Sequence, residues 1–379
     1  MRRDSPMNDV LIAGVGMVPF GNHGPGVGVK LGRDAALAAL QDAHLTYADI
    51  DAVVVGTAHP LSPRGIFVAK ELGLTGVPVQ HVTNASATGL SAMHCARQAI
   101  LSGDARRVLV VGMDSPQKAV PVEDIIVAEG NLPPVVSFAL WAKRRMHESG
   151  TTREHLAAIT AKNWNYAREN PFAARRAPEP VTIERVLGSR MIADPFTSMM
   201  CTPWGEGAAA AVLCSDDGWP VGATQPRIRL AGSAFGSDAY SPELILEGAI
   251  VGPPELSQRT AAQALTQASV KRSDVDVVQV HDAFAVEELM YYELLGFSEP
   301  GPTEALVGEG AFGPGSRERF GLPEFSTDGG LLARGHPGGP TGLAQIWETV
   351  RRLRGKDRVG MCHLLGAGSV CVVQVLVRD

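Results

Sequence analysis

Apolar and polar positions follow two different periods along the chain, and these predict helices and buried strands in turn. In ALAALQDAHLTYADIDAVVV (36–55), apolar residues recur at helical spacing, and a short polar turn then leads into a β-branched run. The segment AAQALTQASVKRSDVDVVQV (261–280) has the same order. Strands that are apolar throughout and alternate with helices are typical of parallel-type sheets covered on both faces. The pattern therefore predicts an α/β fold.

These two segments are copies within an internal repeat. A displacement of 225 positions places one over the other with eight identical residues. A second pair, 87–113 and 340–366, starts from a shared Thr-Gly-Leu and continues in both copies as a helix, a charged loop and a strand. Matches that recur in the same order indicate a duplicated α/β unit.

A third pair of segments, the opening strands 10–16 and 228–236, places the start of each copy. We therefore expect an N-terminal half at residues 8–222 and a C-terminal half at residues 223–379. Two such halves that share a helical middle layer predict a five-layered α/β/α/β/α body.

Extra residues, about 115–195, separate the copied parts of the first half and predict an inserted loop domain. They include NPFAARRAPEP (170–180), which is polar, basic and rich in proline. Such an insertion either holds substrate or forms a surface flap without a role, and the sequence leaves both open.

The composition excludes several classes of function. A net charge of −6 over 379 residues argues against binding of nucleic acid. No apolar run approaches the length of about 20 residues that spans a membrane, and none follows the two N-terminal arginines as in a secretory signal. Five cysteines without C-x-x-C spacing predict a reducing, cytoplasmic location, no disulfide framework and no metal site.

Four residues are candidates for chemistry. Ser86 lies at the start of the predicted helix in TNASATGLSAMHCARQAI (83–100), His281 follows a buried strand, His336 lies in a glycine-rich loop, and His363 precedes a Gly-Ala-Gly turn. In α/β proteins such positions hold ligands and catalytic groups, although a hydrogen-bonded packing role is the alternative for each histidine. In the repeat, Ser86 is equivalent to the glycines that follow His336. Twofold pseudo-symmetry would therefore bring the hydroxyl of Ser86 close to the imidazole of His336, and nucleophilic catalysis requires such a pair.

Five short motifs carry a resemblance to a known family. NASATG, MCTPWGEGAAAAVL, HDAF, GGLLARGHPGGPTG and HLLGAG occur in this order, and over nearly its whole length the chain resembles the thiolase superfamily. It is most similar to the sterol-carrier-protein-type and archaeal acetoacetyl-CoA branch, which has His-Asp-Ala/Cys-Phe in place of Asn-Glu-Ala-Phe. The resemblance implies a thiolase fold, and it places Ser86 where the family has its nucleophilic cysteine.

The same resemblance implies roles for the other candidates. His336 would activate the nucleophile, and His281 would belong to the oxyanion hole for the thioester enolate. Backbone N–H groups at Ser86 and around Gly368 would form the second oxyanion hole. Many thiolases have a further catalytic cysteine in a Cys-x-Gly motif, whereas this chain has His363 and a glycine turn in that region, so His363 is a possible site residue.

A serine changes the chemistry expected of such a site. Its acyl product is an oxygen ester, more stable than the thioester from which it forms, and serine is almost wholly un-ionised at pH 7. Three functions remain open: a thiolase-type acyltransferase in which Ser86 inactivates or traps, a retro-aldolase acting on β-hydroxyacyl-CoA without covalent catalysis, and a non-catalytic acyl-CoA-binding subunit. In the second, Tyr291 or Tyr292 would be a proton donor.

The resemblance also implies ligands and partners. The substrate would be a coenzyme A thioester, with no covalently bound cofactor, and the chain would form a homodimer. Relatives in this branch associate with a small zinc-ribbon/OB-fold protein, so we expect such a partner as a possible second subunit.

Overall fold

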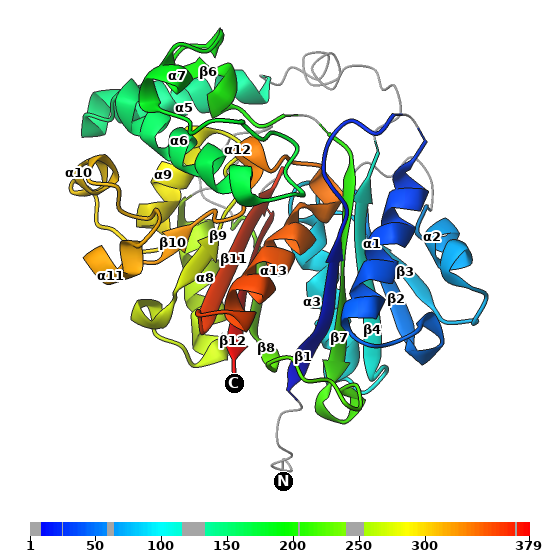
Figure 1. The fold of residues 1–379 in the computed structure, drawn as a ribbon. Coiled ribbons are helices and arrows are strands. Elements are labelled where there is room, and N and C mark those ends of the chain that lie inside the picture. Colours follow the sequence, from blue (N-terminus) through cyan, green and yellow to red (C-terminus); the bar gives the residue numbers. More distant parts are fainter. Residues whose placement is uncertain are drawn as a thin grey trace.

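A ten-stranded sheet forms the centre of the molecule in the computed structural model, which describes residues 9–24, 26–58, 64–115, 133–203, 205–239, 254–367 and 370–379 (Figure 1). From one edge to the other, the strands are β10 (Glu324–Phe325), β9 (Val277–Gln279), β11 (Val359–Gly366), β12 (Val370–Arg378), β8 (Ile228–Ser237), β1 (Val10–Met17), β7 (Gly207–Ser215), β4 (Arg107–Asp114), β2 (Ala52–Gly56) and β3 (Val79–Val82).

The strand order has the twofold symmetry that the repeat predicts. Read from one edge, β3, β2 and β4 are parallel, and β7 and β1 then continue the sheet antiparallel. From the other edge, β10, β9 and β11 are parallel, and β12 and β8 are antiparallel. The two sets meet where β1 pairs with β8, at Leu11 and Arg229. Each strand therefore has its counterpart in the other half.

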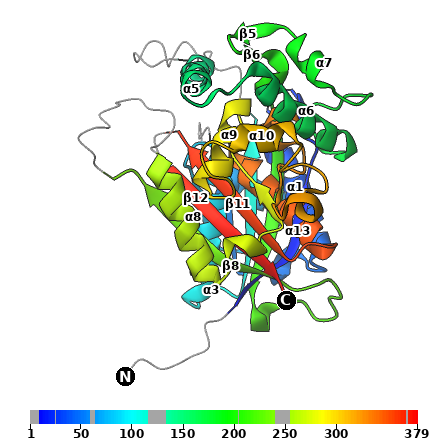
Figure 2. The same ribbon diagram turned by 90° about the vertical axis from the view of Figure 1, so that its left-hand side faces the viewer.

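Helices lie outside and between the two halves of the sheet. The helices concerned are α1 (Gly28–Asp42), α2 (Arg64–Leu72), α3 (Thr88–Leu101), α8 (Pro254–Ala268) and α13 (Gly338–Arg354). α1 and α2 cover the outer face of the first half, and α8 covers the outer face of the second half (Figure 2). α3 and α13 lie between the halves and contact strands of both. This arrangement confirms the five layers expected from the sequence.

Glycines let the two central helices meet at their N-terminal ends. A Cβ atom on Gly89 of α3 would lie 2.9 Å from the carbonyl oxygen of Gly339, and one on Gly342 of α13 would lie 2.5 Å from the backbone nitrogen of Leu90. Any larger residue would force the backbones apart. The chain thus brings together the two helix starts that the repeat makes equivalent.

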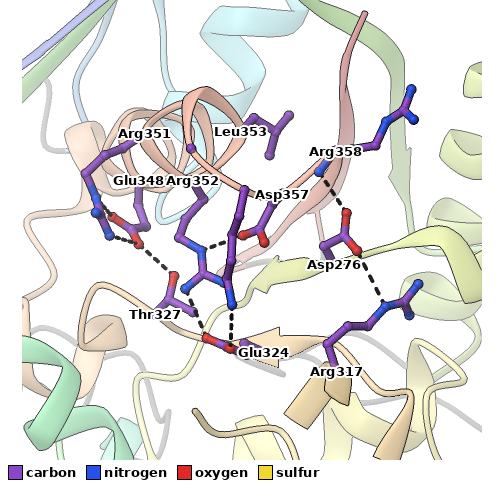
Figure 3. A network of polar contacts seen from close by, with 12 residues as sticks. Asp276, Arg317, Glu324, Thr327, Glu348, Arg351, Arg352, Leu353, Asp357 and Arg358 are labelled. Atoms are coloured by element: carbon purple, nitrogen blue, oxygen red, sulfur yellow. Dashed lines mark hydrogen bonds and ion pairs between the residues drawn. The ribbon is translucent and has the colours of Figure 1, made fainter. Parts of the chain in front are cut away.

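Ion pairs hold the other end of α13. Arg352 donates to Asp357 at 2.5 Å and to Glu324 of β10 at 3.0 Å, and Arg351 donates to Glu348 at 2.8 Å through two nitrogens (Figure 3). Thr327 donates to Glu348 at 2.7 Å. These contacts fix α13 to the loop between β10 and the glycine-rich segment.

The remaining elements connect these strands and helices. They are α5 (Pro134–Ser149), α6 (Arg153–Glu169), α7 (Ile183–Leu187), α9 (Ala285–Leu294), α10 (Thr303–Gly308), α11 (Ser316–Phe320) and α12 (Gly330–Ala333), with a hairpin of β5 (Met191–Ala193) and β6 (Phe196–Thr197) and 3-10 helices at Tyr47–Asp49, Ser198–Met200, Asp216–Gly218 and Arg272–Asp274.

The insertion is more regular than the loop domain expected from the sequence. In its described part, α5, α6 and α7 account for most of the residues (Figure 1). Thr152 caps α6 by accepting from the backbone nitrogen of His155 at 3.3 Å, and Thr182 caps α7 by accepting from that of Arg185 at 3.2 Å. Among its described residues, the longest irregular stretch is the proline-rich one between α6 and α7. Within the described ranges, no helix is both long and apolar enough to cross a bilayer.

Candidate active site

A strained turn presents Ser86 just before α3. Ala85 has a φ of 47°, in the left-handed region that a residue with a Cβ adopts at a cost of about 1–3 kcal/mol. Thr88 holds this turn, because its hydroxyl donates to the carbonyl oxygen of Ala85 at 2.6 Å and accepts from the backbone nitrogen of Asn84 at 2.8 Å. The side chain of Ser86 remains partly exposed beside the helix start.

Ser86 and His336 are joined directly. The Ser86 hydroxyl oxygen lies 2.8 Å from Nε2 of His336, and Nδ1 of His336 lies 2.7 Å from the hydroxyl oxygen of Thr341. Thr341 donates its only hydroxyl proton to the carbonyl oxygen of Pro337 at 2.7 Å. Nδ1 must therefore carry the proton in the bond to Thr341, so Nε2 of a neutral His336 accepts the proton of Ser86.

His281 is oriented by a buried carboxylate. Its Nδ1 lies 2.8 Å from Oε1 of Glu287, while Oε2 of the same carboxylate accepts from the backbone nitrogen of Phe284 at 3.0 Å. Glu287 lies in the first turn of α9, so its second bond is that of a capping residue. Nε2 of His281 is buried and has no hydrogen-bond partner among the described residues.

The two imidazoles face each other. The ring centroids of His281 and His336 are 5.2 Å apart, and the planes are nearly perpendicular at 86°. The structure thus brings Ser86, His281 and His336 together from three distant parts of the chain. The turn before α3, the loop after β9 and the glycine-rich segment before α13 each supply one residue.

The remaining candidates lie behind this cluster. His363 is fully buried, and its Nε2 lies 2.9 Å from the hydroxyl oxygen of Ser257. Burial, with a smaller contribution from His281, lowers the pKa of His363 to about 3, so the imidazole is neutral. The ring of Tyr291 lies 4.4 Å from that of His363, and burial raises the pKa of Tyr291 well above its usual range.

Tyr292 and Gly368 have different positions. Tyr292 stacks on Phe312 in the core, with ring centroids 3.8 Å apart, and donates to Glu288 at 2.6 Å. Gly368 lies outside the described residues. The preceding glycine turn contacts the Ser86 loop, since a Cβ on Gly366 would lie 2.4 Å from the carbonyl oxygen of Asn84.

None of the chain's thiols is prepared for nucleophilic chemistry. All five cysteines lie within the described residues, and burial raises the pKa of each. For four of them the pKa rises to about 12: Cys201, Cys214, Cys362 and Cys371. A thiol reacts as its thiolate, so these side chains are inert at neutral pH. The hydroxyl of Ser86, by contrast, is hydrogen-bonded to an imidazole.

A buried polar network connects the catalytic loops with the insertion. Asp282 accepts from the backbone nitrogen of Leu331 at 2.7 Å and from the side chain of Asn163 at 2.8 Å. Asn163 of α6 also donates to Glu288 of α9 at 2.6 Å. Burial, together with the nearby Glu288, raises the pKa of Asp282 well above its usual range. The loop of His281, the segment before His336 and α6 are therefore held as one unit.

Three contributors were missed by the sequence reasoning: Glu287, Thr341 and Asn163. Glu287 lies three residues after Phe284 in the motif VHDAFAVEEL, which is the spacing of a capping acid. Thr341 is five residues after His336, about one helical turn into α13. Asn163 gave no signal, because its partners come from residues more than a hundred positions away.

Comparison with known proteins assigns the family. The profile "Thiolase, N-terminal domain" matches residues 10–193, and "Thiolase C-terminal domain-like" matches residues 254–362. The chain belongs to the thiolase superfamily. This thiolase-type chain is accordingly an enzyme of the acyltransferase class, and the family and fold predicted from its motifs are confirmed.

Individual relatives extend over the whole chain. The benzoylsuccinyl-CoA thiolase subunit BbsB of Thauera aromatica is 32% identical over 378 residues, which cover 95% of each chain. The acetyl-CoA acetyltransferase of Methanothermobacter thermautotrophicus is 32% identical and covers 98% of this chain and 100% of its own. Among solved structures, the Ltp2-ChsH2(DUF35) aldolase is 25% identical, with a TM-score of 0.84 over 99% of both chains.

Proposed function

We propose that this thiolase-type enzyme cleaves or forms the C–C bond of a β-ketoacyl-CoA, with Ser86 as the nucleophile in place of a thiol. The observation that carries the proposal is the hydrogen bond from Ser86 to Nε2 of His336 at 2.8 Å, with the tautomer fixed through Thr341. It is the arrangement of an activated serine and its base. The N-terminal end of α3 adds a partial positive charge where an oxyanion would develop.

In the cleavage direction, the oxygen of Ser86 attacks the β-carbonyl carbon while its proton passes to His336. The tetrahedral oxyanion is stabilised by backbone N–H groups at the start of α3 and, as the resemblance implies, around Gly368. Its collapse breaks the bond to the α-carbon. The products are an ester on Ser86 and the enolate of the shortened acyl-CoA, which His281 faces.

An ester on Ser86 would return its acyl group to coenzyme A slowly. The oxygen ester is more stable than a thioester, so the second half of a thiolytic cycle runs uphill. Every thiol of the chain has a raised pKa, which supports Ser86 as the attacking group. We therefore expect the acyl-enzyme to accumulate, and Ser86 to act as a trap for the acyl group.

The substrate we propose is a coenzyme A thioester from lipid or aromatic degradation, handled without a covalently bound cofactor. The name of the Thauera relative, a benzoylsuccinyl-CoA thiolase subunit, supports this class. The solved aldolase that the chain resembles is named together with a DUF35 protein, which supports a small accessory subunit here as well. A homodimer and a cytoplasmic location complete the proposal.

Intact-protein mass spectrometry tests the proposal. The protein and its Ser86→Cys and Ser86→Ala variants are incubated with a panel of β-ketoacyl-CoA esters. We expect a persistent acyl adduct on the parent, turnover with release of the shortened acyl-CoA for Ser86→Cys, and no adduct for Ser86→Ala. If neither the parent nor Ser86→Cys acquires an acyl group, the proposed function is wrong.

A second candidate is retro-aldol cleavage of a β-hydroxyacyl-CoA without a covalent intermediate. The likeness to the solved aldolase supports it, as does the imidazole–carboxylate pair of His281 and Glu287, which lies beside His336. In that case Ser86→Ala would still cleave β-hydroxyacyl-CoA to an aldehyde or ketone and an acyl-CoA. Failure of both reactions, with acyl-CoA binding retained, would instead support a non-catalytic subunit.

A further inference from the structure

The proposed cleavage needs a second proton carrier. The proton of Ser86 goes to His336 and returns to Ser86 when the ester is released, so it is not available to the enolate. That enolate must take a proton at its α-carbon from another group. Cys362 and Cys371, on the two strands next to this region, are fully buried, and burial raises the pKa of both to about 12.

His281 and Glu287 form the other acid–base pair at the site. The carboxylate of Glu287 is fixed at both oxygens, by Nδ1 of His281 at 2.8 Å and by the backbone nitrogen of Phe284 at 3.0 Å. It is buried, with 1% of its surface exposed, so water does not compete for these bonds. The imidazole therefore has one orientation, and its Nε2 is left without a partner among the described residues.

A carboxylate changes what this imidazole can do. A histidine that only stabilises an oxyanion needs one N–H donor, which a neutral amide supplies equally well. An ionised carboxylate at Nδ1 additionally stabilises the imidazolium, so that Nε2 can lose a proton and regain it while Nδ1 stays bonded. For the first role Glu287 would only orient the ring, whereas the second role also uses its negative charge.

We propose that Glu287 is a positioning residue that makes His281 the proton carrier for the α-carbon of the thioester. This inference rests on the proposed function and deepens it. Nε2–H of the imidazolium gives its proton to the α-carbon, and the electron pair of the broken C–C bond forms the new C–H bond. His281 is left neutral beside the ionised Glu287.

The second half of the cycle restores the pair. The thiol of coenzyme A gives its proton to Nε2 of His281 and attacks the ester carbonyl as a thiolate. The oxygen of Ser86 leaves and takes back the proton held by His336. Each imidazole thus ends in the protonation state in which it began, and no oxidant, reductant or further reactant is needed.

The surroundings of His281 fit a role in proton transfer. On one side the ring of His336 lies 5.2 Å away, in contact with Ser86. On the other side lie Tyr291 and His363, whose rings contact each other and which burial keeps uncharged. Glu287 is therefore the carboxylate bonded to His281 within the described residues, and glutamine in its place keeps an oxygen that can accept from the backbone nitrogen of Phe284.

Exchange of α-protons tests the inference independently of Ser86. The probes are acetyl-CoA and propionyl-CoA in D2O, and the readout is deuterium incorporation by mass spectrometry. The parent should exchange, because exchange needs no acyl-enzyme. Glu287→Gln keeps the shape and His281→Asn keeps an N–H donor, yet we expect each to lower the exchange rate at least about 100-fold, the size of a general acid–base contribution.

A matched control and a binding measurement separate this role from a structural one. Glu348→Gln removes another buried carboxylate, at the far end of α13, and should leave the exchange rate unchanged (Figure 3). The dissociation constant for acetyl-CoA should change less than about threefold in Glu287→Gln. Exchange at the parent rate in both Glu287→Gln and His281→Asn would overturn the inference, as would a parent that exchanges neither probe. If Ser86 is not acylated but α-protons still exchange, only the proposed function is overturned.

Discussion

Substitution of Thr341 by valine tests the assignment of His336 as the base for Ser86. Thr341 is fully buried, and its hydroxyl accepts from Nδ1 of His336 at 2.7 Å while it donates to the carbonyl oxygen of Pro337 at 2.7 Å. Valine keeps the volume and removes both bonds. The proton on Nδ1 then loses the acceptor that Thr341 supplies, which costs about 1–3 kcal/mol.

The other tautomer of His336 avoids this cost, because its proton lies on Nε2 and bonds to the oxygen of Ser86. That tautomer cannot take the proton of Ser86. A bias of about 1–3 kcal/mol toward it corresponds to a loss of about 5- to 150-fold in the productive form. The same factor should appear in the rate at which Ser86 is acylated.

The assay is single-turnover acylation by a β-ketoacyl-CoA, followed by intact-protein mass. Thr341→Ser keeps the hydroxyl and serves as the matched control, with an expected rate within about threefold of the parent. Acylation of Thr341→Val at the parent rate would refute the tautomer argument and, with it, the assignment of His336 as base.

Three further predictions follow from the structure. Gly342→Ala places a Cβ 2.5 Å from the backbone nitrogen of Leu90 and should lower the free energy of unfolding by about 1–3 kcal/mol in urea denaturation. Gly308→Ala is the control, because a Cβ there has nothing within 4 Å, and it should leave the free energy of unfolding unchanged. Equal effects of the two substitutions would contradict the close approach of α3 and α13. Burial lowers the pKa of His363 from 6.5 to about 3, so between these pH values the unfolded chain binds a proton that the folded chain does not. The free energy of unfolding should therefore fall as the pH drops from about 6.5 toward 3, by at most about 5 kcal/mol. Denaturation curves for His363→Gln should show less of this fall. In the native protein at pH 8, iodoacetamide should react slowly with every cysteine. Ser86→Cys should gain one thiol that reacts at least about tenfold faster, because it lies at a helix N-terminus beside His336. An unreactive thiol at position 86 would contradict the electrostatics proposed for the site.

The fold was predictable because duplication leaves its trace in the sequence. Two copies of a helix–turn–strand pattern separated by 225 residues became α1 with β2 and α8 with β9, and the shared Thr-Gly-Leu became the starts of α3 and α13. The contact between the starts of α3 and α13 followed from the twofold pseudo-symmetry of the two copies alone. The helices of the insertion were not predicted. Its proline-rich stretch dominated the sequence pattern, whereas the helix caps are short signals of only a few residues.

The candidate site was predictable in its reacting groups and not in the groups that orient them. Ser86, His281 and His336 each lie in a motif at a helix start, a strand end or a glycine-rich loop. Glu287 and Thr341 act through side-chain geometry within one or two turns of their histidines, and many acids and threonines share such spacings. Asn163 depends on the packing of α6 against α9, which sequence periodicity does not define.

The orienting partners also distinguish the two imidazoles, which otherwise look alike. Nδ1 of His336 ends on the neutral hydroxyl of Thr341, which donates its own proton to Pro337, so no charged partner stabilises an imidazolium at this nitrogen. Nδ1 of His281 ends on a buried carboxylate, which stabilises a positive charge on the ring whenever Nε2 holds a proton. Exchanging the partners would exchange the roles: a carboxylate at His336 would favour the imidazolium that cannot accept from Ser86. In the proposed mechanism, the positions of Thr341 and Glu287 are therefore what makes one ring the base and the other the acid.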